Sequence, residues 1–438
     1  MEAYLKRRAE LYTWMARNSV SVVVLEDTEG RRDPGIRYFT GHPSDALLVM
    51  TITGHAVLCP WDELMAHKMA NVDVIVPYTD FGRNPVAAVR GIAERIGVPS
   101  RSRIEIPGVT PYPLFLRYVE ALLEYDVICR EGGAGREIER MRSIKDAAEI
   151  ETIEKACSIT DAIINLIEKQ LKGGKIKTES DVALLIEREA RAAGAEGTGF
   201  ETLAAGPERS FGIHAFPPYT ASAFPGSGLS ILDFGIKYRG YTSDVTLTVV
   251  SGDVTPAQEK QLALVEKAYK AALELYKPGV PTRDAPIKVD EIFRKAKRTM
   301  PHALGHGIGL EAHEGPAVRN REDNDWVYEP GMVVTLEPGL YHPEHGGCRL
   351  ENDVLITENG YRLLTNSRII RLGAAAAVSP DAGEPTEAAK TPKAAKTERK
   401  RGTTTDSPVA KSPSGKMGKA KANGSGKKGP RAGNTDYV

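Results

Sequence analysis

Two aspartates lie in a segment that predicts a β-hairpin, residues 229–250 (LSILDFGIKYRGYTSDVTLTVV). Both flanks are rich in β-branched and apolar residues, and a tight turn is expected at residues 238–240. If the turn centres on Tyr238 and Arg239, Asp233 and Asp244 face each other, which places their Cβ atoms ~5 Å apart. Two like charges at that separation repel, so a cation is expected between them.

The hairpin offers no side chain that could supply this cation. Lys237 and Arg239 lie at the turn, on the wrong side of the aspartate pair. A divalent metal ion is the natural solution, because hard cations bind carboxylate oxygens. The alternative is that one aspartate caps a turn while the other faces water.

A second predicted hairpin carries two glutamates. Its arms, GMVVTLEPG and CRLENDVLIT, flank a loop, YHPEHGG, that is rich in turn residues, and Glu337 and Glu351 are equidistant from Glu344 at its centre. A carboxylate in an apolar strand is costly unless it is paired or ligated. Either glutamate could instead face solvent at a sheet edge.

Histidines follow between the hairpins, in PHALGHGIGLEAHEGP. Glycines on both sides of His306 allow close approach of backbone or ligand. Neutral imidazole is the commonest metal ligand in proteins, and we expect His313 to share the same cleft. His42, His55 and His67 have no such setting and are interpreted as structural residues.

These five side chains suggest a two-metal site formed by Asp233, Asp244, His306, Glu337 and Glu351. Four carboxylates balance the charge of two divalent ions and leave a near-neutral site that can hold a hydroxide. Ions ~3.5–4 Å apart can share that hydroxide and stabilise a tetrahedral intermediate. The chemistry implied is hydrolysis of an amide or ester.

Four motifs occur in order along the chain: DFGxxYxGYxSD, GHGIGLxxHExP, TLEPG and RLEND. Together they resemble the signature of the pita-bread metallopeptidases, which include prolidase, aminopeptidase P and methionine aminopeptidase, over roughly residues 140–370. The resemblance implies that Asp233 chelates one metal, that Asp244 and Glu351 bridge both, and that His306 and Glu337 complete the other. Glu337 would also accept a proton from the attacking water.

The same resemblance implies two substrate-contacting histidines. His313 would bind the substrate or the tetrahedral oxyanion, and His214, in SFGIHAFPP, would be the second. One departure from the family pattern is Leu247, where many prolidase-like sequences place Arg in D-x-T-R-T. A missing arginine there could change ligand orientation or substrate preference. Arg349 and Tyr241, beside the ligands, are open to a substrate-contacting or a structural role.

The first 135 residues, with GIRYFTGHPSDALLVM inside them, resemble the creatinase- and prolidase-like N-terminal domain. The resemblance implies a homodimer and hydrolysis of the bond before proline, as an Xaa-Pro dipeptidase or an aminopeptidase P. Manganese or cobalt is expected, with iron or zinc as alternatives. Two other functions stay open: a metal-dependent lyase or other hydrolase on the same fold, and a non-catalytic relative that binds peptides or nucleic acid.

The elements that must position these residues fall into three regions. Residues 1–135 alternate strand and helix patterns, which predicts an α/β domain ending at a Gly-rich break near Gly135. Residues 140–372 begin with a strongly helical stretch and continue with hairpins, which predicts an α+β domain with the pita-bread fold. Residues 373–438 contain almost no large apolar side chain, so a disordered tail is expected.

Bulk composition is that of a globular protein. The chain has 438 residues, 41% hydrophobic and 26% charged, with zero formal net charge. Its last 66 residues hold 13 Lys or Arg and 6 Asp or Glu, so a basic tail follows an acidic body; nucleic-acid contact by this tail is a less favoured reading. Four scattered cysteines, no secretory signal pattern and no apolar run of ~18 residues predict a soluble cytoplasmic protein without membrane contact.

Overall fold

A computed structural model describes residues 2–373. The predicted tail, apart from Gly373, lies outside the described residues. The order of the N-terminal sheet is β4-β3-β2-β1-β5-β6. Its strands are β1 (Val22–Asp27), β2 (Ala46–Thr51), β3 (Ala56–Pro60), β4 (Val74–Ile75), β5 (Arg103–Ile106) and β6 (Asp126–Cys129). The β1–β2 and β2–β3 pairs are antiparallel and the other pairs are parallel.

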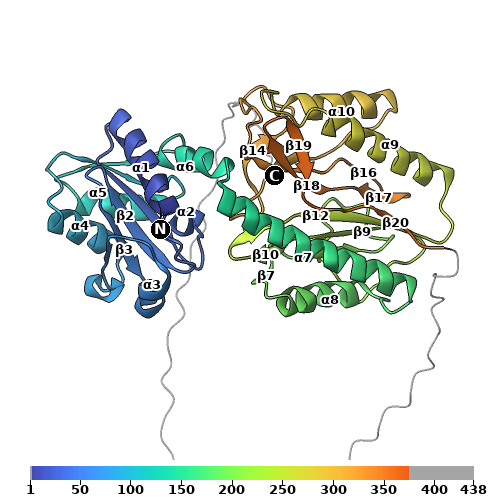
Figure 1. Ribbon diagram of the computed structural model, residues 1–438, viewed down its shortest axis with the longest axis horizontal. Coiled ribbons are helices and arrows are strands. Elements are labelled where there is room, and N and C mark those ends of the chain that lie inside the picture. Colours follow the sequence, from blue (N-terminus) through green and yellow to red (C-terminus); the bar gives the residue numbers. More distant parts are fainter. Residues whose placement is uncertain (1, 374–438) are drawn as a thin grey trace, which may run out of the picture. The chain divides into compact units, whose positions relative to one another are not determined.

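Apolar residues on both faces of this sheet explain why helices cover both (Figure 1). In β1, Val23 and Leu25 contact one helical layer, whereas Val22 and Val24 contact the other, as the alternation of a strand requires. The first layer contains α1 (Glu2–Arg17), α2 (Pro34–Thr40), α3 (Glu63–Met69) and α6 (Ala134–Ser143). The second contains η1 (Tyr78–Phe81), α4 (Pro85–Arg95) and α5 (Tyr112–Ala121).

The remaining described residues form an α+β region built on two larger sheets. One sheet, in the order β20-β12-β9-β8, contains β8 (Leu203–Ala205), β9 (Gly228–Phe234), β12 (Val245–Ser251) and β20 (Ile369–Arg371). The other, in the order β14-β13-β15-β18-β19, contains β13 (Gly305–Gly307), β14 (Glu314–Val318), β15 (Val333–Leu336), β18 (Asn352–Thr357) and β19 (Gly360–Leu363).

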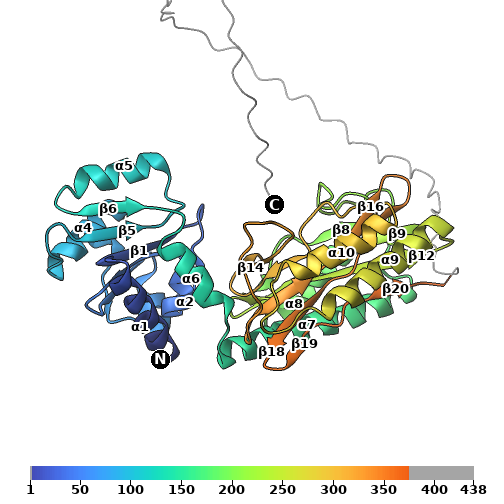
Figure 2. The ribbon, with the colours of Figure 1, turned by 90° about the horizontal axis from the view of Figure 1, so that it is seen from above.

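Two helix pairs cover these sheets from outside (Figures 1 and 2). The first pair, α7 (Ala147–Lys172) and α8 (Glu179–Ala192), packs on apolar side chains of β9 and β12. The second pair, α9 (Pro256–Leu273) and α10 (Asp284–Lys295), packs on β15 and β18. Capping boxes at Asp146, Thr178 and Thr255 begin α7, α8 and α9. The predicted α+β architecture is confirmed, while the boundary near Gly135 stays a prediction.

The turn of the first hairpin lies one residue further along the chain than the sequence predicted, and the strand register shifts with it. In the small sheet formed by β7 (Gly197–Thr198), β10 (Ile236–Tyr238) and β11 (Tyr241–Thr242), Tyr238 pairs with Tyr241. The turn therefore centres on Arg239 and Gly240, whose φ angles are 47° and 87°. A two-residue turn in which both central residues have positive φ matches the right-handed twist of the flanking strands. Glycine at the second position adopts a positive φ without steric cost.

This shift makes the predicted face-to-face aspartate pair wrong. Asp233 in β9 is opposite Thr246 in β12, while Asp244 lies in the break between β11 and β12. The two carboxylates are therefore offset along the hairpin.

The second hairpin has the expected symmetry. Leu336 pairs with Asn352 in the five-stranded sheet, and Gly339 pairs with Arg349 in a two-stranded ribbon of β16 (Gly339–His342) and β17 (Gly346–Arg349). Glu337 and Glu351 occupy matching positions, as predicted, but each lies just outside a strand where the hairpin passes from sheet to ribbon.

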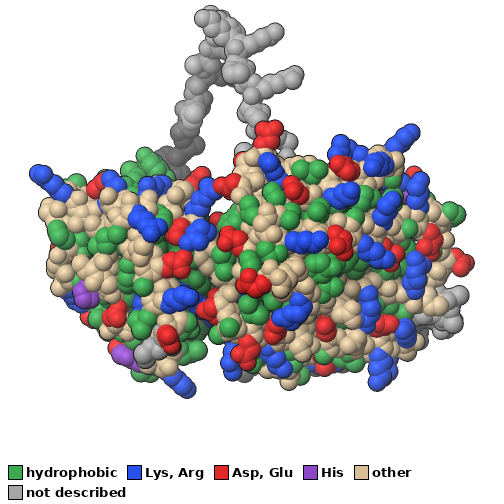
Figure 3. All heavy atoms as spheres, turned by 45° about the horizontal axis from the view of Figure 1, so that its top comes forward, with side chains coloured by type: hydrophobic (Ala, Val, Ile, Leu, Met, Phe, Trp, Pro, Cys, Tyr) green, Lys and Arg blue, Asp and Glu red, His purple; other side chains and the backbone are tan. Residues whose placement is uncertain are grey.

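No helix of residues 2–373 is long and apolar enough to cross a membrane. All four cysteines are free thiols. On the face drawn in Figure 3, Lys and Arg side chains are interspersed with Asp and Glu.

Candidate metal centre

Three of the predicted ligands converge in the interior of the α+β region. The candidate ligand atoms of Asp244, His306 and Glu351 all lie within 4.8 Å of one another. They come from three separate segments: the residue before β12, the middle of β13 and the residue before β18. Asp244 and Glu351 are buried, and the His306 side chain is 14% exposed.

The Glu337 carboxylate also lies close to the imidazole of His306. Nε2 of His306 lies 3.7 Å from Oε1 of Glu337 and 3.8 Å from Oδ2 of Asp244, which is too long for hydrogen bonds. Nδ1 of His306 is 3.1 Å from the carbonyl oxygen of Gly307 and donates to it in the neutral tautomer. The lone pair of Nε2 therefore faces the two carboxylates, as a metal ligand requires.

Asp233 lies outside this group of three and is held by Arg349. Nη2 of Arg349 donates to Oδ2 of Asp233 at 2.5 Å, whereas Oδ1 of Asp233 is buried without a hydrogen-bond partner. Asp233 is nonetheless close enough for its charge to raise the pKa of Asp244 and of Glu351. Its free oxygen can bind a cation.

The electrostatics of the cluster are unfavourable without a cation. Burial, and next the charge of Glu351, raise the pKa of Asp244 and Glu337 well above their usual values. Burial, and next the charge of Asp233, raise the pKa of Glu351 to about 7. Oδ1 of Asp244 is also buried without a partner. Mutually repelling, partly unsatisfied carboxylates beside a neutral imidazole fit divalent metal ions.

Both predicted histidines of the substrate side are near this cluster. The ring centroids of His306 and His313 are 4.1 Å apart. Burial, and next the charge of His313, lower the pKa of His306 to about 3, so the imidazole stays neutral. His214 is exposed on its loop, and its charge contributes to the lowered pKa of His313 after burial.

The sequence interpretation missed His302 and Tyr341. Nε2 of His302 lies 3.0 Å from the Tyr341 hydroxyl, and Nδ1 lies 2.7 Å from the Ala303 carbonyl oxygen. Arg349 Nη1 donates to the Tyr341 hydroxyl at 2.8 Å, so this hydroxyl can donate in turn to His302. Because Nδ1 of His302 is also 3.8 Å from Oε2 of Glu337, this chain of groups borders the ligand cluster. The sequence did contain one signal for His302, which is its position only four residues before the predicted ligand His306.

Arg349, which the sequence left open between two roles, is hydrogen-bonded to the predicted ligand Asp233. It is 2% exposed, and besides Asp233 and Tyr341 it donates through Nε to Thr246 Oγ1 and through Nη1 to the Ile213 carbonyl oxygen. Thr246 Oγ1 donates in turn to Oε2 of Glu351 at 2.6 Å. One guanidinium thus orients two predicted ligands. Tyr241 instead donates to Glu149, away from the ligands.

Asp353 holds the backbone of the predicted ligand Asp244 through a hydrogen bond. Its Oδ2 accepts from the backbone N–H of Asp244 at 3.0 Å and from the Cys157 thiol at 3.5 Å. The side chain is fully buried. Nothing in the RLEND motif distinguished this aspartate from an ordinary strand residue, because its partners come from 109 and 196 residues away.

The structure locates Leu247, the residue that departs from the family pattern, away from the site. Leu247 is fully buried among apolar side chains of α7 and α8, while its neighbour Thr246 faces Glu351 on the opposite side of β12. The expected effect on ligand orientation therefore has no direct contact to act through.

We expect Leu247→Arg to destabilise the protein by ~2–4 kcal/mol, because it buries an unpaired charge. Urea unfolding of the metal-free protein measures this, with Leu247→Met as the volume-matched control. An arginine tolerated without loss of stability would contradict the buried position.

The chain is similar to known proteins in sequence and in fold. Residues 151–358 match metallopeptidase family M24. The chain is 32% identical over 378 residues to an Xaa-Pro dipeptidase of Pyrococcus horikoshii, covering 84% of this chain and 99% of the relative. A second Xaa-Pro dipeptidase, of Pyrococcus furiosus, is 39% identical over 235 residues, which is 52% of this chain and 65% of the relative.

Solved structures show the same fold. A crystal structure of an X-Pro aminopeptidase from Thermotoga maritima superimposes with a TM-score of 0.73 at 26% identity, covering 83% of this chain and 99% of that one. The prolidase from Pyrococcus horikoshii gives a TM-score of 0.71 at 27% identity, with the same two coverages. From the family match, the near full-length relative and the shared fold, the chain belongs to metallopeptidase family M24.

Proposed function

We propose that this protein hydrolyses the peptide bond before proline, as an Xaa-Pro dipeptidase or aminopeptidase, with two divalent metal ions. The observation that carries the proposal is the convergence of buried, mutually repelling carboxylates on the free Nε2 of His306. Relatives named Xaa-Pro dipeptidase and X-Pro aminopeptidase support the choice of substrate.

Five residues would hold the metals. Asp233 would bind one ion, Asp244 and Glu351 both, and His306 and Glu337 the other. When bound, the ions would lower the pKa of the attacking water and polarise the scissile carbonyl. The donor set, four carboxylates and one imidazole, suits manganese or cobalt, with iron or zinc as alternatives.

The protein groups around the ligands have separate tasks. Glu337, whose pKa is raised by burial and by Glu351, would accept the proton of the attacking water and return it to the leaving nitrogen. His313 and His214 would contact the substrate or the oxyanion. Arg349 and Thr246 hold Asp233 and Glu351 in place through hydrogen bonds.

Assembly and location are also proposals. A homodimer would cover apolar side chains that α5 and its flanks leave exposed, at Tyr112, Leu116, Val119 and Leu123. Four free thiols support a reducing compartment such as the cytoplasm.

The test is metal-dependent hydrolysis by chelator-stripped protein. We expect cleavage of an Xaa-Pro dipeptide or an Xaa-Pro-Xaa tripeptide after Mn²⁺ or Co²⁺ is restored, and little cleavage of the matched Xaa-Ala peptides. The ratio of dipeptide to tripeptide cleavage distinguishes dipeptidase from aminopeptidase. Stoichiometric metal binding without cleavage of either proline peptide would overturn the assignment and favour another substrate on the same fold.

A further inference from the structure

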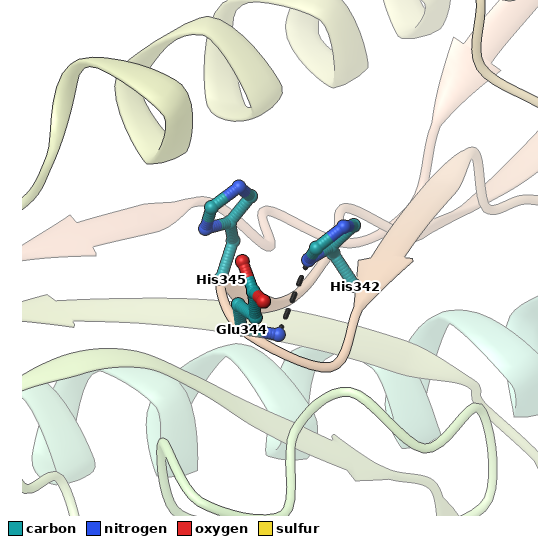
Figure 4. Close-up of side chains that lie close together, drawn as sticks. All are labelled: His342, Glu344 and His345. Atoms are coloured by element: carbon teal, nitrogen blue, oxygen red, sulfur yellow. Dashed lines mark hydrogen bonds between the residues drawn. The ribbon is translucent and has the colours of Figure 1, made fainter.

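A second group of potential metal ligands lies at the tip of the β16–β17 ribbon. It differs from the predicted ligands in composition, with two histidines and one carboxylate, and it is more exposed to solvent. His342, Glu344 and His345 each offer one ligand atom, and these atoms lie within 4.8 Å of one another. Figure 4 shows the three side chains gathered on one short loop. Glu344 is exposed and the two histidines are half-buried, so solvent ions have access.

The backbone of this loop is held in place. Its ends are paired residues of β16 and β17, and the N–H of His345 donates to the His342 carbonyl oxygen at 3.1 Å. Gln258, on α9, donates to the His345 carbonyl oxygen at 3.1 Å. Gln261, one turn further along α9, donates to the carbonyl oxygens of Leu340 and Gly346. Preorganisation of the loop reduces the entropy cost of chelation.

The Glu344 carboxylate on this loop is free to bind a cation. Within residues 2–373, Glu344 forms no ion pair with Lys or Arg, and no carboxylate oxygen lies within 4.0 Å of either imidazole nitrogen pair, Glu344 being the nearby acid of the group. The two imidazole rings are stacked, with centroids 4.3 Å apart and planes inclined by 16°.

From this arrangement we propose that His342, Glu344 and His345 form a second metal site for a borderline-soft divalent ion such as Zn²⁺ or Ni²⁺. Two imidazoles and one carboxylate are the donors that such ions prefer, and three protein ligands leave a position for water. The acid-rich cluster around Asp244 has the opposite preference, for harder ions. The two sites therefore select different metals.

Binding changes the loop in two ways. The backbone N–H of Glu344 donates to Nδ1 of His342 at 3.1 Å, so this solvent-exposed hydrogen bond opens when Nδ1 becomes a ligand (Figure 4). The rings also turn from parallel, because lone pairs lie in the ring planes and must converge on one ion. The opened hydrogen bond is solvent-exposed, so water can satisfy the freed N–H of Glu344.

The experiment measures binding to the full chain with the first site disabled by Asp244→Asn and Glu351→Gln. After chelator treatment, equilibrium dialysis against micromolar Zn²⁺ or Ni²⁺ is expected to leave about one ion per chain. Further exchange of His342 and His345 for Asn removes that ion, and either exchange alone weakens binding at least about tenfold. Mn²⁺ at the same concentration is not retained.

His67→Asn is the matched control, because His67 also lies beside a carboxylate, Glu63 at 3.5 Å, but has no second imidazole. It is expected to leave the bound ion in place. If the disabled background does not fold, the same histidine exchanges in the otherwise unchanged chain must lower Zn²⁺ stoichiometry by about one. Unchanged stoichiometry in the double variant, or retention only at millimolar metal, overturns the proposal.

Discussion

An Asp244→Asn protein is expected to lose activity on Xaa-Pro peptides by roughly 10³-fold or more, while its chelator-stripped form becomes more stable. The loss follows because a missing ligand removes several kcal/mol of transition-state stabilisation. The gain follows because one of the buried carboxylates that repel each other becomes neutral; burial and the charge of Glu351 raise the pKa of Asp244. We expect the stripped form to gain on the order of 1 kcal/mol.

Paired measurements distinguish these effects. Thermal unfolding with chelator compares the stripped proteins, and unfolding with Mn²⁺ compares the loaded ones. Metal should stabilise the parent protein far more than the variant, because only ions bound to the native state raise its unfolding temperature. Full metal-dependent activity of the variant would refute Asp244 as a ligand, and a large loss of stability in the stripped form would refute the repulsion argument.

Replacing Arg349 by Met is expected to have the largest effect on stability, a loss of ~3–5 kcal/mol in the free energy of unfolding. Removing one member of a buried ion pair leaves the other charge uncompensated, and here Thr246, Tyr341 and the Ile213 carbonyl also lose a donor. Urea unfolding measures the change.

Two control variants sharpen this test. Arg321→Met removes an arginine from an exposed pair with Asp323 and is expected to cause no measurable change. Arg349→Lys keeps the charge but not the planar fork, so it should fall between the parent and Arg349→Met. If Arg349→Met were as stable as the parent, Arg349 could not be the group that holds Asp233.

The candidate ligands could be predicted because carboxylates in apolar strands are conspicuous. Glu337 and Glu351 interrupt runs that otherwise read as buried strands, and a buried charge needs a partner. Asp244 was selected for a different reason, its assumed pairing with Asp233 across the first hairpin, and the register used for that pairing was wrong. A single residue in the turn, Gly240 as its second central position, changed every partner in the hairpin.

The groups that support the ligands were not predictable in the same way. Asp233 receives its cation from Arg349, which is 116 residues away, and Asp244 rests on Asp353, 109 residues away. Such contacts depend on how the separate sheets and the β16–β17 ribbon meet, which neither periodicity nor spacing reports. The helical layers were easier, because their apolar faces and capping residues are local signals.

The passage of the second hairpin from sheet to ribbon has a consequence for how this sequence can change length. The register is fixed on both sides of the two glutamates. Leu336 pairs with Asn352 on the side of the five-stranded sheet, and Gly339 pairs with Arg349 on the side of the ribbon. A residue inserted beside Glu337 would turn every following side chain of the ribbon to the other face, and Arg349 would lose Asp233. Inserted residues at the tip, beyond His342, would leave both glutamates where they are. Length variation at the far end of the hairpin would therefore spare the candidate metal centre around Asp244, whereas variation beside Glu337 would disrupt it.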